Sequence, residues 1–218
     1  MADIFHEVDE EVRRERLQQL WDRYSIYVIA LAVLIVAAIG GWRGYEYWET
    51  KKAAAAGAAF ESALSLSEAG KHAEAEAAFA KVATEAPAGY RMLARLRAAG
   101  ELAQIKPADA VKAYDEIAAD SSLGPVLQDL AAVRAAMLTV DSAPLSEMQR
   151  RLDLVAGAGR AFRHNARELL ALSAWRNHDF AAARRYIDMI ATDAETPPGT
   201  RARADVLSAL IAADGSKS

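Results

Sequence analysis

The stretch His72–Ala86 reads HAEAEAAFAKVATEA, and its pattern of side chains returns twice further along the chain. The other copies are PADAVKAYDEIAAD at Pro107–Asp120 and DFAAARRYIDMIATDA at Asp179–Ala194. Each copy has a small residue, an aromatic residue four positions later and an aliphatic residue three positions after that: Ala75, Phe79 and Val82; Ala110, Tyr114 and Ile117; Ala182, Tyr186 and Met189. Residues four and three apart share one face of a helix, so each copy predicts a helix with one buried face.

A weaker fourth copy, SEMQRRLDLVA at Ser146–Ala156, has Leu152 in the aromatic place. The four markers, Phe79, Tyr114, Leu152 and Tyr186, are then 35, 38 and 34 residues apart. This spacing fits the period of about 34 residues that is typical of tetratricopeptide repeats. The alternative is a generic helical bundle, because alanine-rich helices resemble one another by coincidence.

Partner helices are predicted between the copies, at 53–69, 89–104, 124–140, 161–177 and 198–213. All six prolines of the chain fall at the predicted joints and none lies in the middle of a helix. Strand signals are almost absent. The sequence therefore predicts an all-α fold, in which residues 53–213 form about four helical hairpins and a closing helix.

The second feature is the apolar stretch Tyr24–Trp42, YSIYVIALAVLIVAAIGGW, which holds nineteen residues without a charge. As a helix it would be about 28 Å long, close to the thickness of the hydrocarbon core of a bilayer. Tyrosine and tryptophan residues cluster at both ends, as they do at membrane interfaces. We predict a single transmembrane helix at 24–42. A cleaved signal peptide and the buried core helix of a soluble protein are the alternatives.

The predicted helix divides the chain into segments. Residues 1–23 form a short tail with four arginines and seven acidic residues, a net charge of −3. A juxtamembrane linker is expected at 43–52 and a disordered tail at 214–218. A short N-terminal tail before a large C-terminal domain favours a cytoplasmic N-terminus, and Lys and Arg near the helix ends favour it slightly.

Composition excludes several classes of function. The chain has no cysteine, so disulfides and thiol chemistry are ruled out. Residues 43–218 contain 22 basic and 23 acidic residues, and this balance gives no sign of a nucleic-acid partner. The four histidines lack the spacing of metal ligands, and no motif of a hydrolase or a phosphate loop is complete. We therefore expect no catalytic residues, no cofactor and no metal.

A binding surface is the remaining candidate for a functional site. Arginine is concentrated on the predicted partner helices, which usually line the concave face of stacked hairpins. Arg95, Arg134 and Arg167 are predicted to bind acidic or carboxylate-bearing segments of a partner protein. An ordinary solvated helix surface is the alternative. In the apolar stretch, the spacing of Gly40 and Gly44 predicts packing against a second membrane helix, although glycine is common in such helices.

The chain also resembles a known family. The motif Ile39-Gly40-Gly41-Trp42-Arg43, the pair Tyr47-Trp48 and the alanine-rich segment Lys51–Leu64 are similar to those of the ancillary SecYEG translocon subunit family (YfgM-like). This resemblance implies a non-enzymatic bacterial inner-membrane protein with its C-terminal domain in the periplasm. Its implied partners are the SecYEG channel and a membrane-anchored periplasmic chaperone, and translocating polypeptides are possible clients.

Two other functions stay open at this stage. The chain could be a membrane-anchored scaffold or assembly factor for another envelope complex, such as one for cell division or cytochrome maturation. It could also be a hydrolase with a degenerate site, which would require an acid–base pair in a deep pocket.

Overall fold

The structure is a computed structural model that describes the backbone of residues 2–215 and the side chains of residues 21–27 and 29–213. It divides into two units, residues 1–55 and 56–218. Most side chains of the predicted tail at 1–23 lie outside the described residues. Residues 216–218 of the predicted C-terminal tail also lie outside them.

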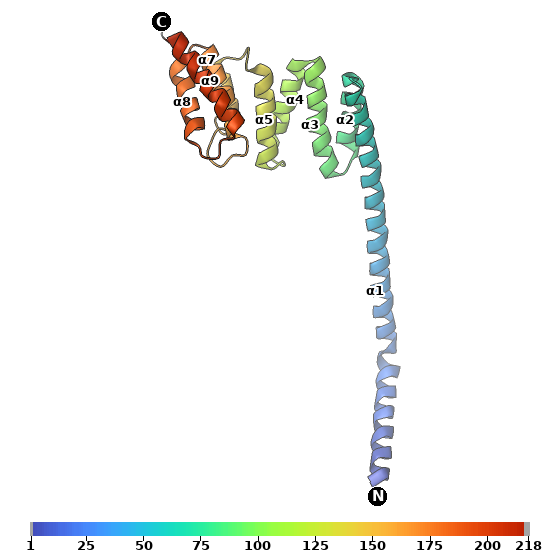
Figure 1. Cartoon of the computed structure of the whole chain (residues 1–218). Coiled ribbons are helices and arrows are strands. Elements are labelled where there is room, and N and C mark those ends of the chain that lie inside the picture. The colour runs from blue at the N-terminus through green and yellow to red at the C-terminus, as the bar shows by residue number, and fades with distance from the viewer. Residues whose placement is uncertain (1, 216–218) are drawn as a thin grey trace. The chain divides into compact units, whose positions relative to one another are not determined.

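The described residues form helices joined by turns, without a strand (Figure 1). The helices are α1 (Ala2–Glu68), α2 (His72–Glu85), α3 (Ala88–Ile105), α4 (Pro107–Ala119), α5 (Pro125–Thr139), α6 (Leu145–Leu152), α7 (Arg163–Arg176), α8 (Phe180–Thr192) and α9 (Pro198–Gly215). The predicted all-α fold is confirmed, and the predicted partner helices correspond to the end of α1 and to α3, α5, α7 and α9. Residues 214 and 215, which we expected in the tail, lie in α9.

Proline sets the start of most helices in the second unit. Pro107, Pro125 and Pro198 are the first residues of α4, α5 and α9, where the missing N–H costs nothing. Pro87 and Pro144 precede α3 and α6. These prolines thus mark where a helix begins after a turn.

The repeated side chains form the core of the second unit. Ala75, Phe79 and Val82 are buried on α2, and Ala110, Tyr114 and Ile117 are buried on α4. In the fourth copy Leu152 and Met148 are completely buried, and Val155 is buried with 3% of its surface exposed. Met148 and Val155 stand four residues before and three after Leu152, so even the weakest copy keeps the spacing of the others.

The copy on α8 differs by one residue. Tyr186 is buried as predicted, but Ala182 and Met189 are only half-buried. Ala183 and Ile190 take the completely buried places, and Ile187 joins them. The buried face of α8 is therefore rotated from the predicted one. The next helix, α9, packs on α8 and on α7, and its Ala204, Leu207 and Ile211 join the same core cluster as the buried face of α8.

Residues 56–68 of α1 form the first helix of the hairpin stack. The Phe60 ring lies edge-on to Phe79 of α2, with 5.2 Å between ring centroids, and 6.0 Å from Tyr90 of α3. Gly57 leaves room for the Tyr90 side chain to lie against α1, because a Cβ at residue 57 would stand 3.0 Å from the Tyr90 hydroxyl. Aromatic pairs at these separations add stability beyond the area they bury.

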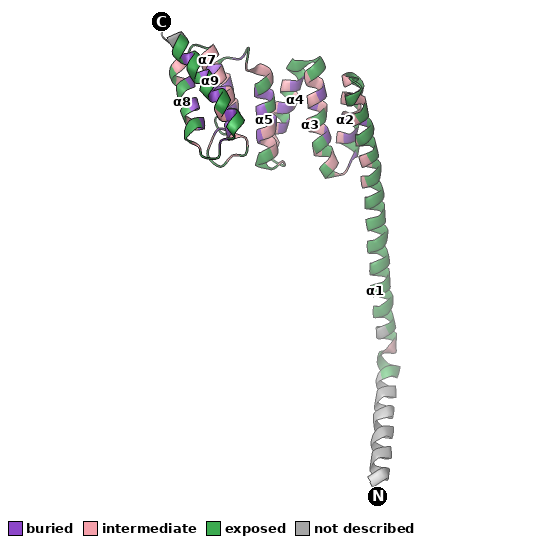
Figure 2. Cartoon of the chain, in the orientation of Figure 1, coloured by how far each residue is buried: buried purple, intermediate pink, exposed green. Residues whose placement is uncertain are grey.

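The apolar stretch of the first unit is exposed along its length (Figure 2). One helical stretch of the described residues, Trp21–Glu68, is long and apolar enough to cross a membrane, and none of its apolar window is buried. The core helix of a soluble protein would be mostly buried, and this stretch is not. The stretch is a candidate membrane span.

The structure predicts a large difference between two leucines that are two residues apart. Leu152→Ala should lower the free energy of unfolding by about 2–5 kcal/mol, because it leaves a cavity at a completely buried site. Leu154→Ala should change it by less than about 0.5 kcal/mol, because that side chain is 75% exposed. Urea unfolding of the full chain in detergent, followed by circular dichroism, measures both. Equal losses would contradict the repeat register.

Candidate functional site

The structure separates the three arginines that the sequence places in one groove. Arg95 lies on α3 and is half-buried, Arg134 lies on α5 and is exposed, and Arg167 lies on α7 and is buried. They differ in their partners as much as in their exposure. Their role in binding stays a prediction, and the surroundings of each one decide what it is free to contact.

Arg167 is held entirely by groups inside the domain. Its Nε donates to the carbonyl oxygen of Ala156 at 2.9 Å, and its Nη1 donates to the carbonyl oxygen of Met189 at 3.1 Å and to Asp193 at 2.8 Å. Hydrogen bonds from Arg163 and Arg167 keep the pKa of Asp193 well below its ordinary value. Arg167 therefore ties α7 to the segment after α6 and to the end of α8, and its side chain is buried.

Arg95 also has a partner inside the domain. Its Nη1 donates to Asp120 at 2.6 Å, across from α3 to the turn after α4. Hydrogen bonds from Ser122 and from Arg95 lower the pKa of Asp120 to about 2. Asp120 is thus a carboxylate at neutral pH, and Arg95 is already neutralised by it.

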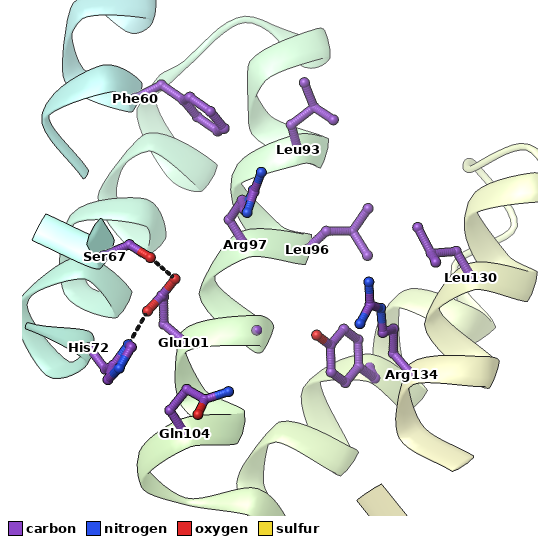
Figure 3. A pocket seen from close by; sticks show the side chains of 12 residues that line it. Phe60, Ser67, His72, Leu93, Leu96, Arg97, Glu101, Gln104, Leu130 and Arg134 are labelled. Carbon is purple, nitrogen blue, oxygen red and sulfur yellow. Dashed lines mark hydrogen bonds and ion pairs between the residues drawn. The ribbon is translucent and has the colours of Figure 1, made fainter. Parts of the chain in front are cut away.

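Arg134 lines a cavity in the second unit (Figure 3). The cavity has a volume of about 650 Å³, within the range of ligand pockets in proteins. Leu93, Leu96 and Arg97 of α3 lie on one side, Leu130 and Arg134 of α5 on the other. Both helices pack on α4, whose Tyr114 also lines the cavity.

One end of the cavity holds a buried carboxylate with both of its oxygens occupied (Figure 3). Glu101 is 7% exposed. Its Oε1 accepts a hydrogen bond from Ser67 at 2.6 Å, and its Oε2 lies 2.7 Å from Nδ1 of His72. The triplet joins the end of α1, the start of α2 and α3. Its geometry is that of a structural hydrogen-bond network, because each oxygen already has a partner.

Two guanidinium groups in the cavity have no such partner. Neither Arg97 nor Arg134 forms an ion pair or a side-chain hydrogen bond with any described residue. Burial raises the pKa of Tyr114, and the positive charges of Arg134 and Arg97 act against that rise. Both guanidinium groups therefore lie within electrostatic reach of one neutral phenol.

Arg97 was not among the predicted site residues, although the sequence carries a signal for it. On α3, Leu93 is followed four positions later by Arg97, and on α5, Leu130 is followed four positions later by Arg134. The two pairs are 37 residues apart, within the range of the repeat spacings. A search for exposed residues that recur with the period of the repeat would have found this pair.

Gly40 and Gly44 lie in the first unit on α1. Nothing lies within 4 Å of the position that a Cβ would take at either glycine. The space beside them is open to another helix, and their packing role stays a prediction. Among the residues that the structure describes, no group of histidine and acidic side chains is arranged to hold a metal ion.

Two of the predicted arginines should respond differently to the same substitution. Arg167→Ala should lower the free energy of unfolding by about 3 kcal/mol, because it removes the partner of Asp193 and of two carbonyl groups. Arg134→Ala should change it by less than about 0.5 kcal/mol. Urea unfolding of the full chain checks both, and since each variant loses one positive charge, each is the charge control for the other. Similar effects would show that Arg167 is not a structural residue.

Comparison with protein families matches residues 18–185 to the tetratricopeptide repeat-like domain. No curated protein matches the chain, and no solved structure matches it. The matched range covers more than half of the chain and includes the apolar stretch as well as most of the hairpins. Domains of this kind are interaction modules that hold other proteins. The chain therefore belongs to the tetratricopeptide repeat-like domain family, whose helical hairpins indicate a scaffold for protein–protein interaction.

Proposed function

We propose that this protein is a non-enzymatic, single-pass inner-membrane accessory of the Sec export channel. In this proposal residues 1–23 are cytoplasmic, residues 24–42 span the membrane and residues 43–52 form the linker. Residues 53–213 form a periplasmic domain that binds partner proteins or emerging chains. The observation that carries the proposal is the exposed apolar helix that belongs, with the hairpins, to one matched range.

The exposure of the apolar stretch supports the membrane part. Ile26, Leu34 and Val36 are each more than 60% exposed, although burying such a side chain gains about 1.5–3 kcal/mol. Lipid supplies the apolar surroundings that the protein does not, and a helix satisfies its own backbone groups there. The aromatic residues Trp42, Tyr45 and Trp48 then lie at the level of the headgroups, where Lys52 sits over the ring of Trp48.

The partners are proposed from two sources. The family membership supports binding of other proteins in general, and the cavity between α3 and α5 provides a place for it. The resemblance over residues 39–64 to the ancillary SecYEG translocon subunit family supports the export channel and a membrane-anchored periplasmic chaperone as the partners. Fixing the domain to the membrane would raise its effective concentration beside such partners without any new contact.

Membrane insertion and orientation are tested together with a C-terminal alkaline phosphatase fusion, which is active only outside the cytoplasm. We expect the unmodified fusion to be active and to resist extraction by carbonate. Val33→Arg combined with Leu34→Arg should remove both properties, since each arginine near the centre of the span costs about 2.5–3.5 kcal/mol on insertion.

The matched control is Val206→Arg combined with Leu210→Arg on α9. Val206 is as exposed as Val33, at 63%, so the control adds the same charge to an exposed apolar position outside the candidate span. It should leave activity and extraction unchanged. An active fusion that carbonate releases would point to a cleaved signal peptide, and an inactive unmodified fusion would overturn the proposed orientation.

The proposed partners are tested by affinity purification of the full chain in mild detergent. We expect channel subunits and the chaperone to be enriched over an unrelated single-pass protein expressed at the same level. A chain without residues 1–45 tells whether the anchor or the outer domain makes the main contact. Enrichment of the subunits of another envelope complex, with the channel absent, would replace the Sec proposal by a scaffold for that complex.

A further inference from the structure

We propose that the cavity between α3 and α5 binds an acidic, leucine-rich segment of a partner polypeptide, whose carboxylates pair with Arg97 and Arg134. This inference names a site and a partner chemistry, and it rests on the proposed docking function. Four observations support it. Two arginines of the cavity have no acidic partner among the described residues, and the buried Glu101 already has hydrogen-bond partners. The walls of the cavity are apolar, and the same leucine–arginine spacing occurs on α3 and α5.

The charge of the cavity favours an anion. Elsewhere in the second unit, five other arginines are already paired with acids: Arg95 with Asp120, Arg151 with Asp115, Arg160 with Asp129, Arg163 with Asp193 and Arg203 with Glu168. Arg97 and Arg134 line the cavity, and neither forms an ion pair with a described acid. The cavity's own acid, Glu101, is buried and held by Ser67 and His72, so it does not neutralise them.

The walls of the cavity favour a polypeptide over a small anion. Leu93 is 47% exposed, and Leu96 and Leu130 are half-buried at the same surface. A free phosphate or acetate ion would cover none of these side chains. A segment that carries leucine beside a carboxylate would bury the apolar walls and pair the guanidinium groups at the same time.

The pattern recurs on both sides. Each helix presents a leucine and, one turn later, an arginine, so the two faces are alike: Leu93 and Arg97 on α3, Leu130 and Arg134 on α5 (Figure 3). Arginine donates two parallel hydrogen bonds to a carboxylate, which gives geometric specificity that lysine lacks. A segment with two acidic residues would therefore match the site better than a segment with one.

The test is direct binding of synthetic peptides to the purified full chain in detergent micelles, measured by fluorescence anisotropy. The probe is a fluorescein-labelled, C-terminally amidated peptide of sequence GSALELLEALS. Two companions separate the contributions: GSALQLLQALS removes the carboxylates, and GSASESSEASS removes the leucines. We expect the first peptide to bind at least about tenfold more tightly than either companion, the factor that ~1.4 kcal/mol represents. Its affinity should fall as salt is raised, because the arginines are exposed.

The protein variants identify the site. Arg97→Ala combined with Arg134→Ala should weaken binding of the first peptide about tenfold or more and leave the peptide without carboxylates unaffected. Arg97→Lys combined with Arg134→Lys should restore part of the affinity, because the charge returns without the paired donors. The matched control is Arg91→Ala combined with Arg184→Ala, two exposed arginines that do not line the cavity and that remove the same charge.

Three results would overturn the proposal. They are equal binding of the acidic and amide peptides, an equal loss in the control variant, and no binding of any peptide at millimolar concentration. Circular dichroism of each variant confirms that its helices are intact. Because the assay uses purified protein and synthetic peptides, its outcome does not depend on membrane topology or on the export channel. A negative result here would leave the wider docking function standing, and the converse also holds.

Discussion

The close approach of neighbouring helices in the second unit depends on small side chains that face a single large one. On α2 and α4 an alanine with no exposed surface stands one turn before a buried aromatic ring. The alanine lets the facing backbone come near, and the ring fills the space beside it at the density of a protein interior. Each buried ring contributes about 1.5–3 kcal/mol, and the contacts are mostly between neighbours in the chain. The domain is therefore stabilised hairpin by hairpin, as in other helical repeats.

The arginines of the second unit fall into two sets, those with hydrogen-bond partners among the described residues of the domain and those without. Arg167 and its neighbours at the α8–α9 end of the domain bind carboxylates and carbonyl groups at the edge of the apolar core. Removing such a partner is costly, because acceptors that are largely shielded from water are left without a donor. Arg97 and Arg134 are the opposite case. Neither forms an ion pair or a side-chain hydrogen bond with a described residue.

The apolar stretch of the first unit has a different pattern of apolar residues from the hairpins. In the hairpins, apolar residues are buried because protein surrounds them. Between Tyr24 and Trp42, large apolar side chains are exposed on every side of the helix. The helix is apolar all round and has no single hydrophobic face. This pattern is typical of a helix surrounded by lipid, whereas a helix packed on a core has one apolar face. The same physical preference for apolar surroundings thus produces a periodic sequence in one unit and a continuous apolar run in the other.

The sequence by itself determined the helices, their order and the repeat. Proline marks the joints, and the spacing of alanine, aromatic and aliphatic residues marks the buried faces, because both act within a few residues of the chain. Only the tertiary structure decided the rotated face of α8, since the residues of α7 and α9 that share its core cluster lie in other parts of the chain. It also decided which arginines are free. Arg95, Arg134 and Arg167 are alike in sequence, but whether a carboxylate lies opposite each one depends on loops 25 or more residues away.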